Sequence, residues 1–100
     1  DILPEGTIAA VRESVAARLQ ARIDAGETSA IPQFATYQLT ILEEPNYETA
    51  YIWYSIAAAL GLKGTLEARD KARENVENDR IIKLQAEAGK IYESLNVNLD

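Results

Sequence analysis

The stretch YETAYIWYSIAAALG, residues 47–61, decides the fold. One face of a helix through it carries apolar residues at three- and four-residue steps, namely Ala50, Trp53, Ala57 and Leu60. The small residues on either side of the indole let a neighbouring helix approach closely. Gly61 can adopt the left-handed conformation that ends a helix. The stretch therefore predicts a helix over about residues 47–60, with Trp53 in the core.

Outward from this stretch, apolar periodicity predicts four more helices, over about residues 7–25, 31–43, 64–76 and 79–95. We expect Thr7 and Asn78 to cap the first and the fifth of the five helices, because their side chains can accept backbone N–H groups. Gly26 stands where the first helix should end, and Pro32 fits the first turn of the second. A strand is the competing structure over residues 36–42, which are rich in β-branched and aromatic types, but helical neighbours favour a helix.

The predicted fold class is all-α, with about five helices in stacked antiparallel hairpins that form a short α-solenoid or a compact helical bundle. One hundred residues suffice for one domain, and 16 alanines indicate a thin core between closely packed helices. A shift of 35 residues superimposes Gly26 on Gly61, with a predicted helix before and after each glycine.

The formal net charge is −6, and residues 1–50 hold most of it, with eight acidic and three basic residues. An acidic surface opposes binding to nucleic acid or an anionic membrane and suits a basic partner. Cysteine and histidine are absent, which removes thiol chemistry, the usual general base and the usual neutral metal ligand. We therefore expect no enzyme, no catalytic or metal-binding residue and no cofactor. No apolar run approaches the roughly 20 residues that span a bilayer.

Three tyrosines, Tyr47, Tyr51 and Tyr54, follow one another at steps of four and three residues beside the Trp53 face. A tyrosine offers a rigid apolar ring with a polar tip, which suits a protein interface. The stripe is therefore a candidate contact surface for a partner. Packing of the same rings between neighbouring helices is the alternative. It is favoured for Trp53, Tyr47 and Tyr54, whereas for Tyr51 neither interpretation is favoured.

Three acidic residues, Glu43, Glu44 and Glu48, gather around the turn at Pro45. They are candidate contacts for a basic partner. A solvated loop and helix start is the plainer interpretation, because acidic side chains stabilise the N-terminus of a helix. No Asp-rich loop surrounds these carboxylates, so neither a cation site nor an acid–base pair is predicted.

Residues 46–61 resemble the first helix of the Sel-one-like repeat, a relative of the tetratricopeptide repeat. The family pattern of an alanine, an aromatic pair, a double alanine and a glycine stands here as Ala50, Trp53-Tyr54, Ala57-Ala58 and Gly61. The segment Ala35-Thr36-Tyr37-Gln38-Leu39-Thr40 looks like the second helix of an earlier repeat, with Thr40 where the family prefers glycine. Ala68-Arg69-Asp70 and Gln85-Ala86 are similar to the C-terminal ends of bacterial members. The resemblance covers about residues 30–95, and one repeat is well marked.

This resemblance implies a single helical-repeat domain over residues 1–100 that binds another protein without catalysis. Residues 30–76 would hold the best-marked repeat helices, residues 77–100 a capping helix, and residues 1–29 an N-terminal helix that is a degenerate repeat or a cap. Bacterial members of this size are often exported, and some look like antitoxin or immunity proteins paired with a secreted effector. A chain without Met at position 1 fits removal of an export signal or of a tag. We expect the bacterial periplasm, with the cytoplasm as the alternative.

Two other functions stay open beside the interaction module. The first is a structural or self-assembling helical domain with no separate ligand. A homodimer that hides the tyrosine stripe would favour this function. The second is a helical domain that binds a small molecule or a metal. A pocket lined by Trp53 and the tyrosines, with polar groups that converge on it, would favour this second function.

Overall fold

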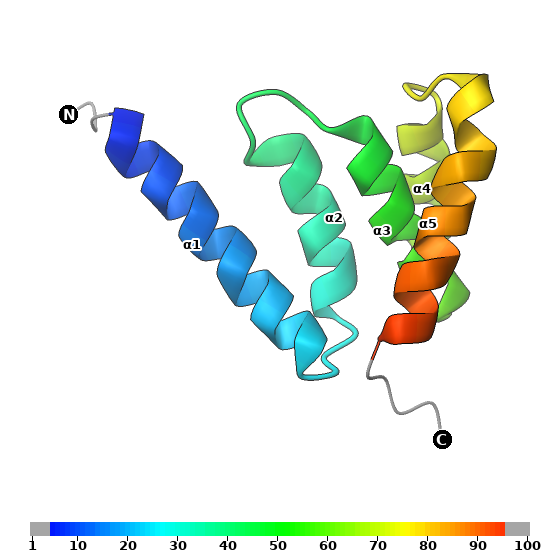
Figure 1. Ribbon diagram of the computed structural model, residues 1–100, viewed down its shortest axis with the longest axis horizontal. Coiled ribbons are helices and arrows are strands. Elements are labelled where there is room, and N and C mark those ends of the chain that lie inside the picture. The colour runs from blue at the N-terminus through cyan, green and yellow to red at the C-terminus, as the bar shows by residue number, and fades with distance from the viewer. Residues whose placement is uncertain (1–4, 96–100) are drawn as a thin grey trace.

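The computed structural model describes residues 5–95 as five α-helices and one short 3-10 helix (Figure 1). The elements are α1 (Glu5–Asp24), α2 (Ala30–Thr40), α3 (Tyr47–Ala59), α4 (Thr65–Arg73), η1 (Asn78–Arg80) and α5 (Ile81–Ser94). The described residues contain no strand, so the predicted all-α class is confirmed. The strand considered for residues 36–42 is excluded, because α2 extends to Thr40 and a turn follows it.

Glycine ends both α1 and α3 in the predicted way. Gly26 and Gly61 have φ angles of 90° and 79°, a region that only glycine enters without strain. The N–H of Gly61 donates to the Ala58 carbonyl and that of Leu62 to the Ala57 carbonyl, which satisfies the last carbonyl groups of α3. The ends of α1 and α3, Asp24 and Ala59, stand 35 positions apart, as do the starts of α2 and α4, Ala30 and Thr65.

The predicted N-caps are wrong at both positions. Helix α1 already begins at Glu5, so Thr7 lies inside its first turns. Asn78 begins η1, and α5 follows Arg80 without a side-chain cap. The cap that the structure does contain is Asn46, whose Oδ1 accepts from the Thr49 N–H at 3.1 Å. A good capping residue type marks a possible helix start, but packing of the whole chain decides where the helix begins.

Helix α3 lies at the centre of the fold. It packs against α2 on one side and against both α4 and α5 on the other (Figure 1). The small residues Ala50 and Ala57 are completely buried, and they let these neighbours approach. Helices α4 and α5 barely contact each other, although they follow one another in the chain. Three helices therefore share one central helix rather than forming a closed ring.

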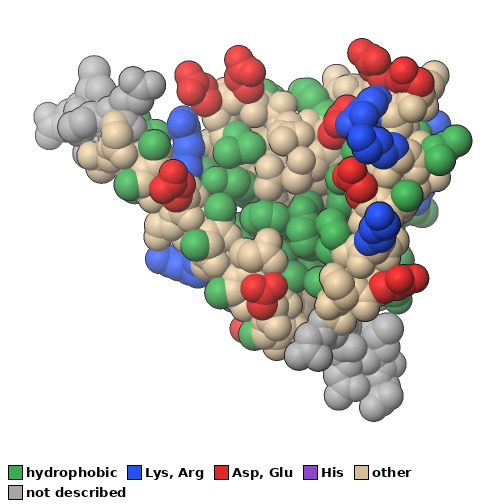
Figure 2. Space-filling model, in the orientation of Figure 1, with side chains coloured by type: hydrophobic (Ala, Val, Ile, Leu, Met, Phe, Trp, Pro, Cys, Tyr) green, Lys and Arg blue, Asp and Glu red, His purple; other side chains and the backbone are tan. Residues whose placement is uncertain are grey.

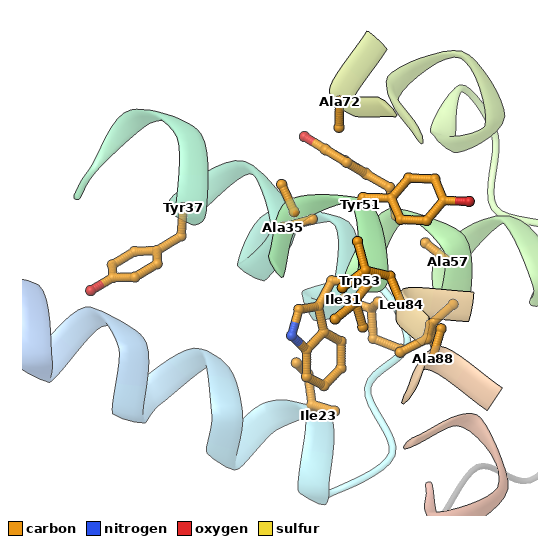
Figure 3. Packing of buried hydrophobic residues seen from close by; sticks show 14 of the residues in the cluster. Ile23, Ile31, Ala35, Tyr37, Tyr51, Trp53, Ala57, Ala72, Leu84 and Ala88 are labelled. Carbon is orange, nitrogen blue, oxygen red and sulfur yellow. The ribbon is translucent and has the colours of Figure 1, made fainter. Parts of the chain in front are cut away.

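The core is thin, as the alanine content indicates. Its largest fully buried side chains are Ile23, Ile31, Ile56 and Leu84, which come from four different helices. Trp53 lies among them, between Ile23 of α1 and the Leu84 side of α5 (Figure 3). Phe34 meets the indole edge-on, with ring centroids 5.1 Å apart, a favoured geometry for two aromatic rings. The prediction that Trp53 belongs to the core is confirmed.

Helix α1 is attached mainly through its C-terminal part. It packs on α2 and diverges from it toward the N-terminus (Figure 1). Among its described side chains only Leu19 and Ile23 are buried, and none of residues 6–18 is. The two helices are also joined by hydrogen bonds from Tyr37 Oη to the Arg12 carbonyl, at 2.9 Å, and from Arg12 Nε to the Ile41 carbonyl, at 3.0 Å.

Candidate functional site

Two of the three candidate tyrosines belong to the core. Tyr51 is 2% exposed and Tyr54 is 7% exposed, whereas Tyr47 is half-buried. The hydroxyl of Tyr54 shares a 2.6 Å hydrogen bond with Thr36 Oγ1 of α2, and that of Tyr51 accepts from Gln85 Nε2 of α5 at 3.3 Å. Tyr51 and Tyr54 therefore follow the alternative of packing between helices, and Tyr47 is the member of the candidate stripe that stays partly exposed. Helix α3 is covered on both sides, so these rings join helices within the chain.

The three acidic candidates separate into two groups. Glu43 and Glu44 are exposed in the loop between α2 and α3. Glu48 instead accepts two hydrogen bonds from Arg80, with Nε–Oε2 at 3.1 Å and Nη2–Oε1 at 3.0 Å. These hydrogen bonds lower the pKa of Glu48 below its ordinary value of 4.5, and the charges of Arg80 and Lys83 lower it further. Glu43 and Glu44 are therefore the carboxylates of the cluster that have no ion-pair partner in the part of the chain that the structure describes.

An apolar groove of about 540 Å³ runs between α1 and α2. Its lining is apolar at Val15, Leu19, Pro32, Tyr37 and Ile41 and polar at Arg18, Gln33, Thr36 and Thr40. Arg22 stands near the end where the two helices meet, with Nη1 3.1 Å from Gln33 Oε1 and Nε 2.7 Å from Glu27 Oε2. The opposite end is open, and the loop that carries Glu43 and Glu44 lies beside it (Figure 1). The groove therefore has a wide end next to an acidic loop.

Two large apolar residues at the groove or beside it are exposed to solvent. Val11 is 52% exposed and Ile41 is 42% exposed, although both are large hydrophobic residues. Figure 2 shows that apolar side chains also gather in a hollow on the viewed face, between α1 and α5, while charged side chains lie around its edge. Burying apolar area of this kind stabilises a complex by about 25 cal/mol per Å² before the costs of association.

The spacing of apolar residues in α1 already indicates that part of this helix is left exposed at the groove. Its regularity makes the stripe look like one continuous buried face. Val11, Val15, Leu19 and Ile23 follow one another at four-residue steps, which the sequence places on one helical face. Each such step turns by about 40° around a helix of 3.6 residues per turn, so the stripe winds around α1. Its later members, Leu19 and Ile23, are buried, and the earlier Val11 is left toward solvent.

The described residues offer no metal site and no bilayer-spanning helix. No group of three or more Asp and Glu side chains among them is arranged so that it could hold an ion. Within residues 5–95 no helix combines the length and the apolar character that crossing a membrane requires.

Comparison with known proteins returned no family model, no curated protein and no solved structure that matches this chain.

Proposed function

We propose that this protein is a non-catalytic interaction module whose α1–α2 groove receives an apolar segment of another protein. The observation that carries the proposal is the uncovered part of α1, where residues 6–18 include no buried side chain. A helical stretch of about a dozen residues is marginal in water by itself, and most helical stability in proteins comes from packing of an apolar face. A partner that covers Val11, Val15 and Ile41 supplies that packing.

The partner segment is an amphipathic helix with a basic residue near one end. A helix laid in a groove buries its apolar side chains at three- and four-residue steps, which suits a wedge formed by two helices. Glu43 and Glu44 beside the wide end of the groove favour a basic side chain there. The acidic character of the first half of the chain supports the same choice of partner.

The finer proposal is a Sel-one-like module that acts as an exported bacterial antitoxin or immunity protein in the periplasm. It is supported by the motif residues of α3, by the packing of α3 on α5, and by the helix boundaries that recur after 35 residues. A secreted basic effector would then be the protein that enters the groove.

The proposal is tested by comparative capture from the source cells. Val11→Asp/Ile41→Asp places one charge on the groove residue Ile41 and one on Val11, which is exposed one turn before the groove residue Val15. Ile82→Asp is the control, since Ile82 is 81% exposed on α5. We expect one protein, measured by quantitative mass spectrometry, to be retained by the wild type and the control and to fall at least tenfold with the groove variant. A Glu43→Lys/Glu44→Lys variant should lower its capture by a smaller factor.

Equal retention by the groove variant and the control would overturn the assignment of the groove. A stable homodimer in light scattering that the groove variant dissociates, with no captured protein, would instead favour the self-assembling domain. Circular dichroism verifies that each variant keeps the helical content of the wild type.

A further inference from the structure

A second cleft, of about 280 Å³, lies on the opposite side of α3 from the α1–α2 groove. It exists because α4 and α5 both pack on α3 but barely contact each other. Its floor includes Tyr51 and Ser55 of α3, and its walls include Arg69 of α4 and Gln85, Gly89 and Tyr92 of α5. The polar groups of three helices thus meet around one opening.

The side chains that line this cleft include no carboxylate, and they are polar at Tyr51, Ser55, Arg69, Gln85 and Tyr92 and apolar at Ile56, Ala59 and Ala88. Tyr51 Oη accepts from Gln85 Nε2, and its own proton has no acceptor in place among the described residues. Within residues 5–95, Arg69 is paired only with its chain neighbour Asp70, through a single carboxylate oxygen at 3.0 and 3.2 Å. A guanidinium has five N–H donors in a planar fork, so Arg69 keeps donors for a further acceptor.

Gly89 leaves one wall of the cleft without a side chain. A Cβ added there would meet no heavy atom within 4 Å, so close packing inside the chain does not require glycine at this position. Glycine within a helix costs about 1 kcal/mol relative to alanine. The helix backbone at Gly89 is consequently open to a molecule that enters the cleft.

We infer that this cleft binds a small organic acid, with its carboxylate on Arg69 and the Tyr51 hydroxyl and its apolar body beside Tyr92 and Gly89. The cleft is slightly smaller than the roughly 300–1,000 Å³ of pockets for drug-sized ligands, which suits an acid with one ring or a short chain. The net charge of −6 does not prevent this binding, because salt screens exposed charges beyond about 8 Å at physiological ionic strength. Charge-assisted hydrogen bonds at the cleft then decide the affinity.

The test uses the complete ¹⁵N-labelled chain and two pairs of probes, phenylacetate with phenylacetamide and hexanoate with hexanamide. We expect saturable chemical-shift changes around Ser55, Gln85 and Gly89 with at least one of the acids. Its uncharged amide should bind at least tenfold more weakly, and inorganic phosphate, which has no apolar body, should cause no saturable change. Equal binding of an acid and its amide would overturn the inference.

Variants then assign the binding to the cleft. Arg69→Gln should weaken the acid at least tenfold, whereas Lys71→Gln, which removes the same charge from an exposed position on α4, should leave its affinity within twofold. Tyr51→Phe keeps the ring and should weaken binding severalfold, and Gly89→Leu should abolish it by filling the opening. Equal effects of Arg69→Gln and Lys71→Gln would show that only overall charge matters and would overturn the site. None of these outcomes depends on the α1–α2 groove.

Discussion

Helices α1 and α3 have similar apolar spacing, but the fold buries a much larger part of α3 than of α1. In α3, seven of 13 residues are buried, and neighbours cover it on both sides. In α1, which has 20 residues, Leu19 and Ile23 are the buried side chains among those described. Apolar periodicity therefore predicts that a helix forms, but it does not tell how much of that helix the chain itself covers. The uncovered length is where a partner can add stability.

The largest expected effect comes from shortening one apolar side chain in each helix. Ile56→Ala should lower the free energy of unfolding by about 2–5 kcal/mol, because Ile56 is 1% exposed and the change leaves a cavity. Val11→Ala should change it by less than about 0.5 kcal/mol, because Val11 already faces solvent. Urea unfolding followed by circular dichroism measures both values.

If Ile56→Ala does not fold, Ile56→Val should still cost about 0.5–1.5 kcal/mol. A loss at Val11 as large as that at Ile56 would mean that α1 is covered in solution and would contradict the comparison.

The second expected effect concerns the glycines that follow the C-terminal ends of α1 and α3. Substitution of either glycine should change the stability by a similar amount. Gly26→Ala and Gly61→Ala each force a side chain into the left-handed region and should destabilise the protein by about 1–2 kcal/mol. Gly89→Ala is the control with the opposite sign, because it replaces a glycine inside α5 and should stabilise the protein by up to about 1 kcal/mol. Thermal unfolding distinguishes the signs. A neutral Gly26→Ala beside a costly Gly61→Ala would show that the end of α1 rearranges freely.

The sequence predicted the helices and their glycine stops, which depend on neighbouring residues, and missed specific contacts between distant residues. The five helices and the glycine stops follow from local spacing and backbone preference. The contacts of Tyr54 with Thr36 and of Glu48 with Arg80 join residues 18 and 32 positions apart, so they depend on how the helices pack. The same limit explains why the sequence left the exposure of Tyr51 open, because an apolar ring at a helix surface fits a partner and a neighbouring helix equally well.

A third, smaller effect should appear in α1 alone. Tyr37→Phe removes the hydrogen bond to the Arg12 carbonyl while it keeps the ring, and it should cost about 0.5–1.5 kcal/mol. Hydrogen exchange measured by mass spectrometry should accelerate in α1 and stay unchanged in α3. Tyr54→Phe is the matched control, because its lost bond to Thr36 joins α3 to α2 and does not touch α1. Acceleration spread evenly over all helices would contradict a separately anchored α1.

The smallest expected effect is a pH dependence of the free energy of unfolding, and it concerns Glu48 in the covered helix α3. Because Arg80 lowers the pKa of Glu48, the folded protein holds that carboxyl ionised more firmly than the unfolded chain does. The resulting stabilisation is fully present above the unfolded pKa, near 4.5, and disappears as the pH falls through the folded value. Between pH 6 and pH 3 the free energy of unfolding should therefore fall more steeply for the wild type than for Glu48→Gln. Glu44→Gln removes an exposed carboxylate and leaves the contact between Glu48 and Arg80 intact, so its slope should stay steeper than that of Glu48→Gln. Parallel slopes for the wild type and Glu48→Gln would show that the contact with Arg80 does not persist in solution.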